Sequence, residues 1–205
     1  MKGWRRIRDE LGLTPVTSVS ALGATERVLL RALERSDCEP FLEMVRKSRD
    51  LHHPWAYPPE RPDQFEDLIA RCRHADSECL LACDRRTGDI AGVFTVSQII
   101  RGAFQSAYLG YYASAQYAGR GYMREAVALV IDYSFGPLGL HRLEANIQPT
   151  NEASIALAIG AGLRLEGYSP RYLLIAGRWR DHERYAITRE EHAEHSRRSK
   201  QVQLG

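Results

Sequence analysis

"AQYAGRGYMREA", residues 115–126, places a pair of glycines around Arg120, at the point where an amphipathic helix is expected to begin. Apolar residues recur downstream at the spacing of one helix face, which predicts a helix over 120–135. Arg120 and Arg124 lie at the start of this helix, where the positive end of the helix dipole disfavours each cation by roughly 0.3–1 kcal/mol. Because the free N–H groups of a helix N-terminus bind anions, the two arginines predict an anionic ligand at this turn.

The two glycines of the turn, Gly119 and Gly121, complete neither of the common nucleotide-binding motifs. They lack the third glycine of the dinucleotide G-x-G-x-x-G fingerprint, and several predicted strands precede them, whereas that fingerprint follows the first strand of its unit. The chain also has no G-x-x-x-x-G-K-[ST] sequence of a Walker loop. A tight turn with both arginines in solvent therefore stays open as the alternative to a ligand site.

The segments around this turn alternate between apolar strand-like runs and amphipathic helices. We expect strands at 27–33, 78–84, 90–100, 106–114 and 141–148, a final pair of strands around residues 176–177, and helices at 38–49, 63–75, 120–135 and 152–161. Asp37 and Asn151 are suited to cap two of these helices, and Gly162 is suited to end the last one. The order predicts an α/β (α+β) domain built on one mixed central sheet.

Length, charge and apolar content indicate one globular domain. The chain has 205 residues, enough for a single sizeable core. Lys and Arg number 28 against 26 Asp and Glu, a net charge of +2 that does not indicate a nucleic-acid partner. Because no uncharged apolar run approaches the roughly 20 residues that span a bilayer, and no apolar segment follows the basic start, we expect a cytoplasmic protein without a membrane partner.

The cysteines and histidines do not indicate a metal site. The four cysteines show no C-x-x-C spacing and are expected to be small buried side chains, neither disulfide-bonded nor zinc-bound: Cys38, Cys72, Cys79 and Cys83. The adjacent His52 and His53 lie in a proline-rich loop, where neighbouring side chains point apart, and no carboxylate spacing supports them. We therefore expect no metal cofactor.

Two longer stretches resemble a known family. "YYASAQYAGRGYMREA", residues 111–126, resembles the acetyl-CoA-binding motif of the GCN5-related N-acetyltransferases, the GNAT superfamily. "PTNEASIALAIGAGLRLEGY", residues 149–168, resembles the N-x-x-S-x-x-L-x-x-x-x-G-[FL]-x-x-E-G segment of its RimJ/RimL type. "HHPW" and "YLLIAGRWRDH" resemble the Pro-Trp loop and closing hairpin of that type. The resemblance covers 25–188, leaving an N-terminal extension at 1–24 and a polar C-terminal tail at 189–205.

This resemblance implies the GNAT fold, with a mostly antiparallel mixed sheet of about seven strands flanked by four helices. It implies acetyl-CoA as the co-substrate, bound through Tyr111, Tyr112, Ala113, Gly119, Arg120, Gly121, Tyr122, Met123, Arg124, Asn151 and Ser154. It also implies that the acceptor amine, flanked by Pro54, Trp55, Tyr172 and Trp179, attacks the thioester directly. The family motif places Ala118 and Met123 where a polar and a small residue are usual, so a catalytically silent acetyl-CoA sensor stays open.

The proton-transfer groups are less clearly marked. By resemblance, Ser154 is a candidate donor to the leaving thiolate, because the tyrosine that often has this role corresponds to Ala158. A glutamate that acts as base in some members corresponds to Asn146, which cannot act as one. Glu144 on the same strand, or the pair Asp181 and His182 on the last hairpin, are the candidate bases.

Acid–base properties favour an α-amine as the acceptor. An α-amine has a pKa of about 7.7–8.0 and lysine about 10.4, so near pH 7.4 a few tenths of α-amines are neutral against roughly one lysine in a thousand. A site without a strong base therefore suits a protein N-terminus, such as that of a ribosomal protein, as RimJ/RimL enzymes use. A small amine is the alternative acceptor, and we expect a monomer or homodimer.

Overall fold

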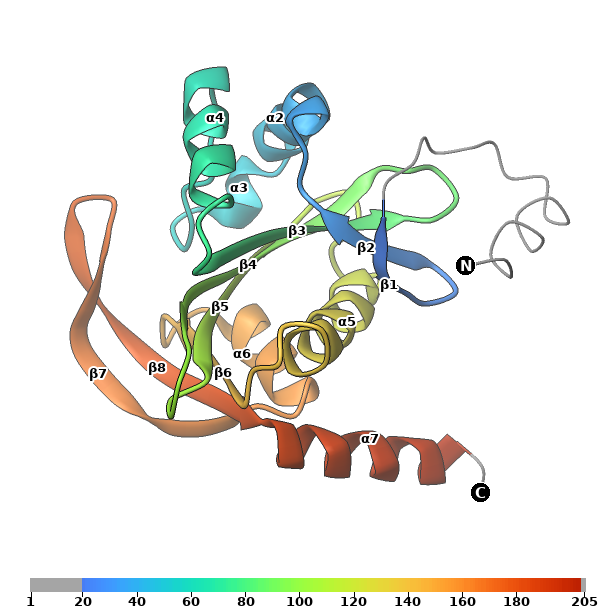
Figure 1. Ribbon diagram of the computed structural model, residues 1–205. Helices are drawn as coiled ribbons and strands as arrows, with labels where there is room; N and C mark the ends of the chain where they lie inside the picture. The colour runs from blue at the N-terminus through green and yellow to red at the C-terminus, as the bar shows by residue number, and fades with distance from the viewer. Residues whose placement is uncertain (1–19, 204–205) are drawn as a thin grey trace, which may run out of the picture.

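The computed structural model describes residues 20–203 and contains a single eight-stranded sheet (Figure 1). The strand order is β1-β2-β3-β4-β5-β6-β8-β7, and every neighbouring pair is antiparallel except β5 and β6. The strands are β1 (Ala21–Ala24), β2 (Val28–Ala32), β3 (Ser77–Asp84), β4 (Ile90–Ile100), β5 (Ser106–Ala113), β6 (Arg142–Ile147), β7 (Arg164–Ile175) and β8 (Arg178–Thr188). The predicted fold class, a mixed and mostly antiparallel sheet with flanking helices, is confirmed.

The helices cover the two faces of the sheet unequally (Figure 1). A short 3-10 turn η1 (Arg35–Asp37) leads into α2 (Cys38–Lys47), and α3 (Arg49–His52) and α4 (Pro62–Arg71) follow. These lie on one face of β2–β4, whereas α5 (Tyr122–Phe135) and α6 (Glu152–Gly160) lie on the other. The last helix is α7 (Arg189–Gln203). In the β6–β8–β7 part of the sheet, α5 and α6 cover one face, and α2, α3 and α4 do not extend over the other (Figure 1).

The apolar pattern of β3 explains its central place in the sheet. Leu80 and Ala82 belong to the cluster around α5, while Leu81 and Cys83 belong to the cluster around α2 and α4. All four side chains are buried. A strand that is covered on both faces reads as a continuous apolar run rather than as an alternation, which is what "CLLAC" shows.

The structure corrects the prediction for two cysteines. Cys72 at the end of α4 and Cys79 on β3 form a disulfide bond, with their Cα atoms 5.5 Å apart. Cys38 and Cys83 are free, as predicted. The short connection between α4 and β3 brings Cys72 and Cys79 together, although their spacing matches no common motif.

A second correction concerns Asp37. It lies at the N-cap position of α2, but its side chain makes no hydrogen bond that caps this helix, and Oδ2 accepts instead from Glu34 N at the start of η1, at 2.8 Å. Both of its carboxylate oxygens also accept from the guanidinium of Arg31, at 2.6 and 2.7 Å. Both side chains are buried, so the Asp37 carboxylate pairs with Arg31 and does not cap α2 as the sequence predicted.

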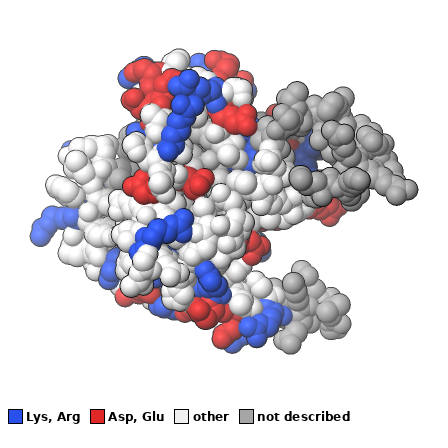
Figure 2. Space-filling view, in the orientation of Figure 1, with Lys and Arg blue, Asp and Glu red and all other residues white. Residues whose placement is uncertain are grey.

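The two ends of the described chain are ordered against the domain. Residues 21–24, expected to belong to an extension, form β1, which pairs with β2. Residues 189–203 of the predicted tail form α7, where His192 Nε2 lies 2.6 Å from Asp132 Oδ1 on α5. No helix within 20–203 is long and apolar enough to cross a membrane. On the face shown in Figure 2, acidic and basic side chains are interspersed.

Candidate active site

The site begins where β5 and β6 separate. The two strands run parallel for three residue pairs, from Ser106 opposite Arg142 to Tyr108 opposite Glu144, and no further pair joins them. The later part of β5 continues to pair with β4 on its other side, as far as Ala113 opposite Gly92. One edge of β5 is therefore left without a strand partner at 109–113.

Hydrogen bonds at the end of β5 show which backbone groups face this gap. The N–H of Ser114 donates to Ala91 O of β4 at 2.9 Å, whereas Ala113 O bonds His52 Nε2 at 2.8 Å, away from β4. Alternate residues of a strand direct their backbone groups to the same side. Tyr111 and Ala113 therefore direct their N–H and C=O groups toward the gap. The C=O of Ala113 is taken by His52, so the N–H and C=O of Tyr111 and the N–H of Ala113 are available to a ligand.

The N-terminus of α5 lies across this gap. Gly121 is its N-cap residue with φ of +85°, and Gly119 has φ of +72°. Both conformations favour glycine. The N–H groups of Gly121, Tyr122 and Met123 make no hydrogen bond within residues 20–203. Because Arg124 lies beside these free donors, the helix start has the properties of an anion site.

Two cavities meet at the gap. The larger, about 590 Å³, lies between the end of β5, the start of α5 and α6. The smaller, about 250 Å³, is bounded by β4, β5, β6 and the β7–β8 hairpin. They share the wall residues Trp55, Ala56, Tyr111, Tyr112, Asn151 and Ser154. A ligand that contacts this wall in one cavity therefore lies next to the other cavity.

Most of the predicted cofactor residues line the larger cavity: Tyr111, Tyr112, Ala113, Gly119, Gly121, Met123, Arg124, Asn151 and Ser154. Arg120 and Tyr122 do not line it. Tyr122 Oη donates to Asp84 Oδ2 at 2.7 Å, and the C=O of Arg120 accepts from the side chain of Arg27. Both residues therefore belong to the outer side of the turn, although the backbone N–H of Tyr122 stays on the free end of the helix.

Ser154 lies at the junction of the two cavities. The side chain of Asn151 accepts from Ser154 N at 3.2 Å, so the predicted helix cap is confirmed. Tyr111 Oη donates to Ser154 O at 3.0 Å and ties β5 to α6. Burial raises the pKa of Tyr111, which keeps this hydroxyl protonated as a donor. The hydroxyl of Ser154 makes no hydrogen bond in the described part of the chain, and so remains available.

The structure places the predicted bases Glu144 and Asp181 outside both cavities. Glu144 is buried and bonds the guanidinium of Arg142 at 2.5 Å. Asp181 accepts from Tyr168 Oη and from Arg171 N, and the hydrogen bond from Tyr168 lowers the pKa of its carboxyl group. Both carboxylates are thus engaged with partners of their own.

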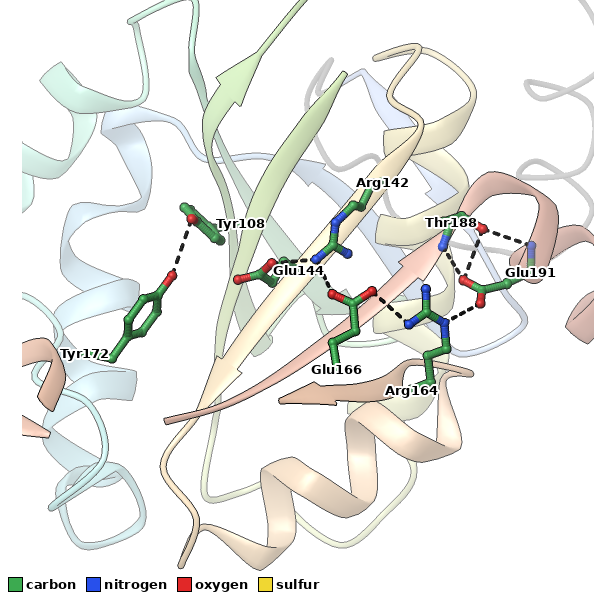
Figure 3. Close-up of polar contacts among 8 residues, drawn as sticks. All are labelled: Tyr108, Arg142, Glu144, Arg164, Glu166, Tyr172, Thr188 and Glu191. Atoms are coloured by element: carbon green, nitrogen blue, oxygen red, sulfur yellow. Dashed lines mark hydrogen bonds and ion pairs between the residues drawn. The ribbon is translucent and has the colours of Figure 1, made fainter. Parts of the chain in front are cut away.

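Figure 3 shows that Glu144 belongs to a chain of ion pairs. Arg142 bonds Glu144 and also Glu166 at 2.7 Å, and Arg164 continues the chain from Glu166 to Glu191 on α7. The chain joins β6, β7 and α7. It therefore holds the C-terminal helix to the end of the sheet.

Among the predicted acceptor residues, Trp55 lines both cavities. Pro54, Tyr172 and Trp179 line neither. Tyr172 Oη lies 3.5 Å from Tyr108 Oη (Figure 3), and the Tyr172 ring contacts that of His182 with centroids 6.1 Å apart. Trp179 is 60% exposed on the β7–β8 hairpin. Tyr172 therefore lies behind the cavity wall rather than on it.

Two buried histidines line the cavities: His182, which the sequence indicated together with Asp181 as a candidate base, and His52, for which the sequence indicated no role in the site. His52 and His182 are each 3% exposed; His52 lines the larger cavity and His182 the smaller. The His52 ring packs edge-on against Tyr112, with centroids 5.2 Å apart. Burial lowers the pKa of both imidazoles. The adjacent His52 and His53 drew attention only as possible metal ligands, whereas strand alternation over "RDHER" could have placed His182 on the open face of the sheet.

The family model for the acetyltransferase (GNAT) domain matches residues 27–164. The [ribosomal protein uS5]-alanine N-acetyltransferase of Escherichia coli is 41% identical over 172 residues, which are 80% of this chain and 89% of that relative. The spermidine N(1)-acetyltransferase of Vibrio cholerae is 26% identical over 162 residues, 78% of this chain and 92% of that relative. The solved structure of Mycobacterium smegmatis RimJ in complex with CoA-disulfide superposes with a TM-score of 0.73 at 29% identity, covering 80% of this chain and 83% of that one.

The chain therefore belongs to the GNAT family of N-acetyltransferases. The comparisons support an enzyme of this family rather than a silent sensor. They include relatives that act on a ribosomal protein and relatives that act on a polyamine. The choice of acceptor therefore depends on the geometry of the cavity beside the cofactor site.

Proposed function

We propose that this enzyme transfers the acetyl group of acetyl-CoA to the α-amine of a protein N-terminus, with an N-terminal alanine of a ribosomal protein as the favoured acceptor. The observation that carries the proposal is the lining of the smaller cavity, in which no residue is Asp or Glu. A polyamine carries several positive charges, and burying them requires carboxylate partners. A peptide N-terminus carries one positive charge on its first amine, and the neutral backbone that follows needs no carboxylate partner.

The polar groups of the smaller cavity fit such an acceptor. Thr95, Asn146 and Gln148 offer hydrogen-bonding side chains to a peptide backbone. Leu173 and Ile175 of β7 offer an apolar wall that suits a small first side chain. A ribosomal-protein acceptor also agrees with the cytoplasmic location expected from the sequence.

The larger cavity has a helix N-terminus and an unpaired strand edge, two features that suit acetyl-CoA. The free N–H groups at the start of α5, with Arg124, would hold the pyrophosphate. The N–H and C=O of Tyr111 and the N–H of Ala113 would bind the pantetheine arm, and one of these N–H groups would stabilise charge on the thioester oxygen. Asn151 would contact the pantetheine arm in addition to capping α6.

When bound, acetyl-CoA supplies a thioester whose carbonyl carbon is open to attack by an amine. Ser154 would supply a hydroxyl proton near the sulfur, since its hydroxyl is free at the junction of the two cavities. Tyr111 would hold Ser154 in place through its hydrogen bond to the Ser154 carbonyl. No step requires a metal ion. Among the described residues, no group of three or more His, Cys, Asp or Glu could hold one.

The test compares three acceptors under identical conditions with acetyl-CoA, read by mass spectrometry. The first is a peptide beginning with alanine, the second is the same peptide with a blocked α-amine and an internal lysine, and the third is spermidine. We expect acetylation of the first, because at pH 7.4 its neutral fraction exceeds that of lysine on the order of a hundredfold. Preferential acetylation of spermidine would overturn the assignment and favour the polyamine activity that some relatives have.

A further inference from the structure

The smaller cavity contains one side chain that can take up a proton near neutral pH. Of the described residues that line it, His182 is the only histidine, and none is Asp, Glu or Lys. Its ring is 3% exposed, so the cavity is its main contact with solvent or ligand. Any proton exchanged with a ligand in this cavity by an ionisable side chain therefore involves His182, or one of the two lining tyrosines, Tyr111 and Tyr112, whose pKa burial raises.

The hydrogen bond of the ring defines which nitrogen is basic. His182 Nδ1 lies 3.0 Å from the backbone oxygen of Arg180. A carbonyl oxygen only accepts, so Nδ1 carries the hydrogen and donates it. In the neutral ring this leaves Nε2 as an unprotonated acceptor. Nε2 makes no hydrogen bond within residues 20–203, and is free for a ligand.

The surroundings of the ring keep it neutral. Burial lowers the pKa of His182, while the hydrogen bond to the Arg180 carbonyl and, to a smaller degree, the neighbouring Asp181 oppose this shift. On β7 the ring faces Tyr172. On β8 itself Arg180 and Arg184 are each two residues away on the same face. On β6 the lining residues Asn146 and Gln148 carry no charge. Near pH 7 His182 is therefore an unprotonated base, as an acceptor of protons must be.

We propose that His182 Nε2 is the general base that takes a proton from the acceptor ammonium. This inference rests on the proposed function, because it requires an amine in the smaller cavity. The proton moves from R–NH₃⁺ to Nε2, which yields R–NH₂ with a free lone pair on nitrogen and a protonated imidazole. The imidazolium then returns its proton to solvent through the cavity. Nδ1 keeps its hydrogen bond to Arg180 throughout, and so holds the ring in orientation.

A second polar atom of the same wall supports this assignment. Asn146 Oδ1 is buried and has no hydrogen-bond partner in the described chain, although Asn146 lines the cavity. A buried acceptor without a donor is costly unless a ligand supplies one. An ammonium group donates up to three hydrogens. Asn146 is thus placed to hold one N–H of the amine while His182 takes another as a proton.

The test uses His182→Gln and, as a matched control, His74→Gln, which makes the same change at an exposed position outside both cavities. At pH 6.5 we expect His182→Gln to lower kcat/KM for the alanine peptide by on the order of a hundredfold, the usual range of general-base catalysis. At pH 9.5 the α-amine is already neutral, so the deficit should shrink to a few-fold. A purely structural role would give the same deficit at both pH values.

Three further measurements keep the result interpretable. The rise in Tm on adding acetyl-CoA should be unchanged in His182→Gln, which shows that the variant folds and binds. Imidazole added to His182→Ala should restore part of its activity. In the wild-type protein, NMR of the histidine nitrogens should show a proton on Nδ1 of His182 and a pKa below the ordinary 6.5.

Failure of this inference is distinct from failure of the proposed function. If the wild type acetylates only spermidine, the proposed acceptor is wrong, and the same comparison at two pH values is made with spermidine. If His182→Gln matches the wild type at pH 6.5 on whichever amine is acetylated, His182 is not the base. A proton on Nε2 in the NMR experiment overturns the assignment without any activity measurement.

Discussion

Replacing Gly121 by glutamate tests whether the start of α5 binds the anionic part of acetyl-CoA. Gly121 has φ of +85°, and a Cβ there would lie 3.1 Å from Arg27 Nη2. Gly88, in the β3–β4 turn, has a similar φ of +83° with nothing within 4 Å of its Cβ. Gly88→Glu therefore has a similar backbone strain at a position outside the cavity. An L-residue in this conformation costs roughly 1–2 kcal/mol, so both variants should lose about 2–8 °C in Tm.

The two variants should differ in their response to acetyl-CoA. At a ligand concentration one hundred times Kd, the wild type and Gly88→Glu should gain about 2.7 kcal/mol, or about 5–11 °C. A carboxylate about 5 Å from one phosphate charge, at an effective dielectric constant of about 20, adds about 3 kcal/mol of repulsion. This weakens binding by at least about a hundredfold and leaves a gain of about 0.4 kcal/mol, or 1–2 °C.

The assay is thermal unfolding followed by intrinsic fluorescence, with and without acetyl-CoA. An equal ligand-induced shift in Gly121→Glu and Gly88→Glu would refute the assignment of the pyrophosphate to this helix end. A loss of the shift in both variants would refute the choice of Gly88 as remote from the cavity. Only a selective loss in Gly121→Glu agrees with the structure.

Two further predictions concern stability, and both are measured by urea unfolding. Burial lowers the pKa of His52 and His182 in the folded protein. As pH falls through about 6.5, the unfolded chain therefore protonates these two histidines while the folded chain does not. The free energy of unfolding should fall below that pH, by up to about 1.4 kcal/mol per pH unit for each histidine. A stability that stays level between pH 7.5 and 5.5 would contradict this. Arg142→Met leaves the buried Glu144 without its cation and should cost about 3–5 kcal/mol, whereas Arg46→Met, which removes only an exposed pair with Glu39, should cost less than about 1 kcal/mol. Equal losses of unfolding free energy in the two variants would show that the buried Arg142–Glu144 pair contributes no more to stability than an exposed pair.

Features that depend on near neighbours in the chain were predictable. The cap at Asn151 and the glycine at 121 each satisfy a local backbone requirement, namely a free N–H at a helix start and a positive φ. The anion site at α5 follows from the same local physics. Together with the family motif they indicated the fold, and they predicted most of the residues that line the larger cavity.

Features that depend on which partner a side chain meets in the folded structure were not predictable. Asp37 has the sequence position of a helix cap, but Arg31 on β2 takes its carboxylate. Tyr122 follows the glycine turn directly, yet the rotation of the helix directs its hydroxyl to Asp84. The basic nitrogen of His182 becomes apparent only when the carbonyl of Arg180 is seen to bond the other one. In each case the partner that the side chain meets in the folded structure decides between roles that the sequence pattern allows equally.

The early end of the β5–β6 ladder has a consequence for the order in which substrates enter. The unpaired edge of β5 is the shared boundary of the two cavities. A cofactor arm lying along this edge would take the place of a missing strand and would form one wall of the smaller cavity, where the acceptor is proposed to bind. That cavity is incomplete until the cofactor has bound, so we expect an ordered mechanism in which acetyl-CoA enters first. By reciprocity of binding free energies, a bound acceptor would then raise the affinity for the cofactor by the same factor.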